Sequence, residues 1–162
     1  MNRRIQRAVG KLRNIILAVL VLMLLSLLLM RLAGVRPYVV MSGSMEPEIK
    51  TGSLCFVNAR AAYEDVREGD IIAFLNGVGM PVTHRAVRIT EVGIETRGDN
   101  NDVTDGITTT EENYLGETVL SLPWAGYVCW IISGKVGKIG IALLACLLCV
   151  TAAISLKREN PI

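Results

Sequence analysis

The 162-residue sequence contains a single histidine, only 5% aromatic residues and a net charge of just +2 at pH 7. With one histidine and no cysteine–histidine set at metal-ligand spacing, we expect no metal site. The small net charge, with basic residues gathered at the N-terminus, gives no sign of a polyanionic partner, so nucleic-acid binding is not expected. The length fits a single domain.

Cysteine is also scarce, and the four cysteines do not form a disulfide framework. Cys146 and Cys149 lie inside an apolar block, where we expect small packing residues rather than a redox pair. Cys55 and Cys129 could pair in an oxidising compartment, but nothing in the sequence places them together.

Long apolar runs, by contrast, are abundant: 51% of the residues are hydrophobic, with the excess in two blocks near the ends. The first block, 15–30, continues past Arg31 to residue 35 and would form about 31 Å of helix, enough to cross the hydrocarbon core. A cleaved secretory signal is the alternative, but Arg31 stands two positions before Ala33, where signal cleavage needs a small residue. We therefore predict an uncleaved membrane anchor.

The second block, 139–156, carries no charge and meets the minimum length for a membrane span. A buried or interfacial helix is the alternative. The five basic residues before the first block predict a cytoplasmic N-terminus: Arg3, Arg4, Arg7, Lys11 and Arg13. Two spans would make this a multi-pass protein of the cell membrane whose middle part lies on the extracytoplasmic face.

The middle part has an ordinary composition, with short β-branched runs separated by turn residues. We expect one short helix at 59–66 and a polar loop at 99–113. Strands are expected at 38–41, 53–58, 70–75, 82–92, 94–97 and 117–120. The prediction is a mainly β fold, a small barrel or two-sheet core between two transmembrane helices.

These observations divide the chain into five predicted segments. They are a basic cytoplasmic tail (1–14), a transmembrane anchor (15–35), an extracytoplasmic β-rich domain (36–135), a second transmembrane helix (136–156) and a cytoplasmic tail (157–162).

The segment 42–47, Ser-Gly-Ser-Met-Glu-Pro, follows the first block closely. Because extended chain covers at most about 3.3–3.6 Å per residue, Ser44 lies no more than about 30 Å from the membrane surface. Gly43 allows unusual backbone geometry and Pro47 fixes the exit of the turn, which would expose the Ser44 hydroxyl. Taken alone, the segment is more typical of an ordinary loop.

A serine hydroxyl becomes a good nucleophile only when a base takes its proton, and His84 is the one imidazole that could do so. A partly buried structural histidine is the alternative. The tract 98–105 adds three carboxylates, Asp99, Asp102 and Asp105. It lacks the glycine and distal glutamate of an EF-hand loop, so it is either a solvated turn or the source of a carboxylate that orients the imidazole.

Together these elements resemble the signal peptidase I family. Segment 42–47 is similar to its nucleophile box, 69–74 to a structural strand, 83–87 to the strand that carries the base, and 98–105 to its acidic box. One branch of the family has a lysine as the base, whereas His84 resembles the endoplasmic-reticulum type of eukaryotes, archaea and some Gram-positive bacteria. A departure is Gly52-Ser53, where the family often has Gly-Asp.

The resemblance implies a role for each candidate residue. Ser44 would be the nucleophile and His84 the general base. Asp105 would partner His84, with Asp99 as the second choice. The Ser44 amide and the Ser42 hydroxyl would form the oxyanion hole.

The reaction implied is acyl transfer to Ser44 and hydrolysis of a peptide bond, without a metal or organic cofactor. The implied substrate is the signal peptide of a secretory preprotein, with small residues at the first and third positions before the cut, held extended by strand addition. The lipid bilayer would be a partner, and the secretion translocon is a further candidate.

A rival interpretation is a non-enzymatic two-span membrane protein with an OB-like β-barrel interaction domain. It accounts equally well for the apolar blocks and the strands. It does not account for the order in which Ser44, the only histidine and the acidic tract follow one another.

Overall fold

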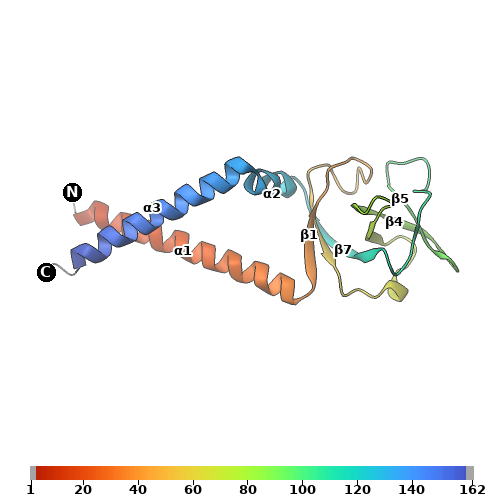
Figure 1. Cartoon of the computed structure of the whole chain (residues 1–162), viewed down its shortest axis with the longest axis horizontal. Helices are drawn as coiled ribbons and strands as arrows, with labels where there is room; N and C mark the ends of the chain where they lie inside the picture. The colour runs from red at the N-terminus through yellow and green to blue at the C-terminus, as the bar shows by residue number, and fades with distance from the viewer. Residues whose placement is uncertain (1–2, 160–162) are drawn as a thin grey trace. The chain divides into compact units, whose positions relative to one another are not determined.

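The computed structural model describes residues 3–159, so residues 1–2 and 160–162 of the two predicted tails lie outside the described residues (Figure 1). The chain divides into two compact units. One comprises Met1–Leu29 with Ile131–Ile162, and the other is Met30–Trp130.

Helix α1 (Arg3–Leu32) is long and apolar enough, over Ala8–Leu32, to cross a membrane. It ends because Gly34 takes a left-handed conformation with φ of +79° and donates its N–H to the Arg31 carbonyl, a common helix C-terminus. Val35, which the sequence adds to the apolar run, already belongs to strand β1 (Val35–Val39).

Near the other end lie helices α2 (Ala125–Ser133) and α3 (Lys135–Glu159). Within the described residues, α1 is the helix that passes as a membrane span by itself, and Ala125–Ser133 with Gly137–Leu148 passes only as a bent pair. The sequence did not predict α2.

The unit Met30–Trp130 is built on one antiparallel sheet with the strand order β1-β2-β7-β3-β4-β5-β6. The remaining strands are β2 (Leu54–Asn58), β3 (Ile71–Leu75), β4 (Pro81–Thr90), β5 (Gly93–Arg97), β6 (Thr108–Thr109) and β7 (Tyr114–Leu122). Strands β1, β7, β4 and β5 of this sheet are labelled in Figure 1. The mainly β prediction is therefore confirmed, as a single curled sheet. Register shifts within β2, β3 and β4 interrupt the ladders, and such bulges bend and twist strands.

Two local predictions were wrong. The helix expected at 59–66 is only a three-residue 3-10 turn, Tyr63–Asp65, because Ala62 and Val66 at its ends are extended. The Arg60 amide also donates to the side chain of Asn58, a turn bond that competes with helix. The polar loop expected at 99–113 contains β6, which pairs with β5.

The described residues contain two clusters of buried hydrophobic side chains. Ile72, Phe74, Ala86 and Ile94 form one between β3, β4 and β5, and Met45, Ile49 and Cys55 form the other. The second cluster matters for the site because Met45, 1% exposed, follows Ser44 directly. Full burial of such a side chain is worth about 1.5–3 kcal/mol, so the loop that carries Ser44 is tied to the core.

Cys55 and Cys129 are both free thiols, so the pairing left open by the sequence is not formed. Burial raises the pKa of the Cys55 thiol to about 11, which makes it an unreactive core residue. Cys146 is also free, and the side chain of Cys149 lies outside the description.

Candidate active site

The loop between β1 and β2 carries Ser44 and is closed by its own hydrogen bonds. Val40 donates to the Ser53 carbonyl at the base of the loop. The Glu46 carboxylate accepts bonds from the amide of Thr51 at 3.1 Å and from its hydroxyl at 2.9 Å. These bonds, the backbone one first, hold the pKa of Glu46 below its ordinary value. The serine is thus presented on a braced turn.

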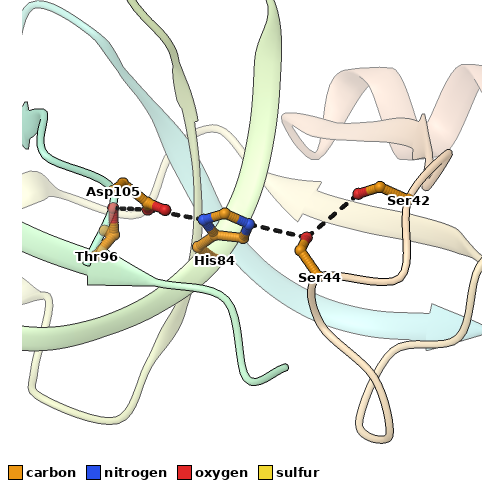
Figure 2. Close-up of polar contacts among 5 residues, drawn as sticks. All are labelled: Ser42, Ser44, His84, Thr96 and Asp105. Atoms are coloured by element: carbon orange, nitrogen blue, oxygen red, sulfur yellow. Dashed lines mark hydrogen bonds and ion pairs between the residues drawn. The ribbon is translucent and has the colours of Figure 1, made fainter. Parts of the chain in front are cut away.

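His84 reaches the loop from strand β4. Its Nε2 lies 2.9 Å from Ser44 Oγ, although the two residues are 40 positions apart (Figure 2). Side chains alternate along a strand, so His84 and Ala86 point into the protein and are buried, while Arg85 faces the other way. The Phe74 ring stands edge-on to the imidazole, with centroids 6.3 Å apart.

The other ring nitrogen of His84 is held by Asp105. The distance from Nδ1 to Asp105 Oδ2 is 2.7 Å, and the same oxygen accepts the hydroxyl of Thr96 at 2.5 Å (Figure 2). The Asp105 amide donates to the Thr96 carbonyl at 2.9 Å. Thr96 lies fully buried on β5, so its two bonds connect the Asp105 loop to that strand.

Asp99 occupies a different position. It receives two parallel bonds from Arg85, Nε to Oδ1 at 2.8 Å and Nη2 to Oδ2 at 2.6 Å. Arg85 also donates to the Gly69 carbonyl, and the bond to Asp99 raises the pKa of its guanidinium. The structure therefore brings Asp105, and not Asp99, to the imidazole, while the catalytic roles stay predictions.

Ser42 lies beside the nucleophile candidate, with 3.2 Å between the two Oγ atoms (Figure 2). Behind Ser44, the acidic tract touches its backbone: the Asn100 amide donates to the Ser44 carbonyl at 2.8 Å. Gly98 permits this approach, because a Cβ atom there would lie 2.5 Å from the Ser44 oxygen.

The sequence assigned no separate role to Thr96, Gly98 or Asn100, which contact Asp105 or Ser44. Gly98 lies inside the acidic box, directly before Asp99, and this position could have identified it as a residue close to the site. A threonine in a strand carries no comparable signal.

A cavity of about 510 Å³ opens in front of the Ser44 hydroxyl. Its walls come from β1 and its extension on one side and from the start of β4 on the other. Apolar side chains dominate these walls, and the polar side chains that line them include Ser42, Ser44, Asn76, Thr83 and His84.

A hydroxyl, an imidazole and a carboxylate joined in this order are the groups that hydrolases use for acyl transfer. In the described part of the chain, no group of three or more His, Cys, Asp or Glu residues could hold a metal ion.

Sequence similarity to known proteins also indicates a hydrolase. The family model for signal peptidase, peptidase S26, matches residues 12–88, which include Ser44 and His84. Signal peptidase I W of Bacillus subtilis is 36% identical over 121 residues, which are 67% of this chain and 64% of that protein. The signal peptidase complex catalytic subunit SEC11C of Homo sapiens is 35% identical over 135 residues, 75% of this chain and 68% of that protein.

The catalytic subunit SEC11 of Colletotrichum graminicola is 30% identical over 125 residues, 65% of this chain and 73% of that protein. The chain therefore belongs to the signal peptidase I family, a family of hydrolases. It spans slightly less than two thirds of the length of the Bacillus subtilis relative.

The close approach of Gly98 to Ser44 predicts a specific sensitivity. Gly98→Ala should lower the thermal unfolding midpoint, because overpacking of this kind costs about 1–3 kcal/mol. Gly77→Ala is the matched control, since its added Cβ meets only the end of the Ile107 side chain at 3.4 Å. Circular dichroism of the detergent-solubilised variants would measure both midpoints, and equal midpoints would refute the packing argument.

Proposed function

We propose that this protein is a membrane-bound signal peptidase that removes signal peptides from secretory preproteins, with Ser44 as nucleophile and His84 as general base. The observation that carries the proposal is the 2.9 Å contact between the only histidine and the Ser44 hydroxyl, within a chain of the signal peptidase I family.

In the proposed reaction, Ser44 Oγ attacks the carbonyl carbon of the scissile bond while His84 Nε2 takes the hydroxyl proton. Asp105 accepts the bond from Nδ1–H, which fixes the ring tautomer and stabilises the imidazolium. The tetrahedral intermediate collapses as the imidazolium gives its proton to the leaving amine. Water, deprotonated by His84, then hydrolyses the acyl-enzyme and releases Ser44.

The oxyanion of this intermediate would be stabilised by the Ser44 amide and the Ser42 hydroxyl. Support for Ser42 comes from its position, with its hydroxyl oxygen 3.2 Å from that of Ser44 and in the same cavity. Loss of one such donor typically lowers the rate about 10²–10³-fold.

The cavity supports an extended peptide with small apolar side chains as the substrate. Strand β1 is at the edge of the sheet, and residues 81–84 of β4 are outside its pairing with β5. Both segments line the cavity. A peptide could therefore add to free strand edges and direct its side chains into an apolar recess, which favours small residues near the cut.

We further propose that α1 anchors the protein, that 136–156 within α3 forms a second span, and that 36–135 lies on the extracytoplasmic face. The five basic residues before residue 15 favour this orientation. The lipid bilayer then surrounds both spans, and the secretion translocon, which delivers preproteins to this face, is the further partner proposed. The rival interaction-domain interpretation leaves the contact between His84 and Ser44 unexplained.

Substitution of the nucleophile tests the activity. Ser44→Ala should abolish cleavage of a model preprotein, and Ser42→Ala should lower it about 10²–10³-fold. Ser121→Ala, on β7 outside the cavity, is the matched control and should cleave like the wild type. Product formation with N-terminal sequencing is the measurement, and full processing by Ser44→Ala would end the peptidase proposal.

Thiol labelling tests the orientation. In sealed right-side-out cells, a membrane-impermeant reagent should label Val78→Cys, which is 78% exposed on the β3–β4 turn, in an otherwise cysteine-free protein. Lys11→Cys should be labelled only after the membrane is opened. The reverse pattern would place the site in the cytoplasm and contradict the proposed topology.

A further inference from the structure

A second cavity, of about 650 Å³, lies where α1 passes into β1. Three arginines line it: Arg31 from the last turn of α1, Arg36 from β1 and Arg60 from the segment after β2. All three belong to the unit Met30–Trp130. Among the residues that the structure describes, no acidic one lines this cavity.

Arg60 is held in place by the backbone around it. Its Nη2 donates to the Leu32 carbonyl at 2.7 Å, and its side-chain stem crosses over Gly34, where a Cβ atom would lie 2.6 Å from Arg60 Cγ. The Ala59 amide donates to the Gly34 carbonyl at 2.9 Å and holds the two segments together. The guanidinium is thus oriented in advance, with further N–H donors left for a ligand.

The positive charge of the cavity is not neutralised from within the protein. Throughout the described residues, no carboxylate lies within ion-pair distance of Arg31, Arg36 or Arg60. Three positively charged residues that line one hollow repel one another, and an anion in the hollow would relieve this repulsion. Guanidinium groups bind phosphate oxygens especially well, through paired N–H bonds.

The position of the cavity along the chain identifies the source of the phosphate. The apolar stretch of α1 ends at Leu32, so in a membrane Arg31 and the cavity would lie at the level of the lipid headgroups. Under the proposed topology this is the extracytoplasmic end of the helix. Membrane proteins generally carry their excess of lysine and arginine on the cytoplasmic side, so three arginines at this end need an explanation. A ligand that is itself part of the membrane accounts for arginines at this end.

We propose that Arg31, Arg36 and Arg60 form a binding site for the phosphate of an anionic phospholipid headgroup. The inference uses the membrane insertion of α1 proposed above, but it does not depend on peptidase activity. Since Tyr38 lines both this cavity and the one in front of Ser44, the lipid site borders the proposed substrate site.

Native mass spectrometry of the full-length protein in detergent tests the site, with phosphatidylglycerol and phosphatidylcholine added in parallel. The wild type should retain phosphatidylglycerol preferentially. Arg36→Gln should weaken that retention about tenfold or more, the usual worth of one charged hydrogen bond. Arg88→Gln removes the same charge from an exposed side chain of β4 and should bind like the wild type.

Equal losses in Arg36→Gln and Arg88→Gln would show a general charge effect and overturn the site. Loss in a Lys11→Gln, Arg13→Gln double variant, with Arg36→Gln unaffected, would move the lipid to the basic tail and also overturn it. Inorganic phosphate at the lipid concentration should not displace the lipid, and displacement would reject the lipid assignment. Ser44→Ala should bind lipid like the wild type, which separates failure of this inference from failure of the peptidase proposal.

Discussion

Ser44 and His84 are 40 positions apart, so the 2.9 Å hydrogen bond between them exists only while several distant contacts hold. Met45 anchors the serine loop in the core from below. The Asn100 amide donates a hydrogen bond to the Ser44 carbonyl, and the missing side chain of Gly98 makes room for this contact. The imidazole in turn depends on the register that sets β4 against β3. Contacts from several distant segments of the chain therefore fix this one distance.

The same constraint explains why His84 and Thr96 are polar although both are buried. A buried imidazole and a buried hydroxyl each cost free energy unless they are hydrogen-bonded. Both ring nitrogens of His84 have partners, and Asp105 Oδ2 satisfies His84 and Thr96 at once. The line from Thr96 through Asp105 and His84 to Ser44 is thus a connected network in which each bond orients the next.

Much of the β fold and of the candidate site could be predicted from the sequence. The strands are short apolar runs between turn residues, and the candidate site residues lie in short motifs that follow one another in order. What could not be predicted depends on contacts between distant segments. The insertion of β7 between β2 and β3 leaves no local signal, and neither does the pairing of Thr96 with Asp105. The separation of Asp99 from Asp105 follows from Arg85, whose outward direction on β4 is visible only once the strand is placed.

We propose that Asp105, and not Asp99, supports the imidazole in catalysis. The most direct measurement compares kcat/KM for preprotein cleavage by Asp105→Asn and Asp99→Asn. Asp105→Asn should lose activity on the order of 10⁴-fold, because an amide favours the wrong histidine tautomer. Asp99→Asn should lose much less, since it only weakens the pair with Arg85. A larger loss at Asp99 than at Asp105 would contradict the account.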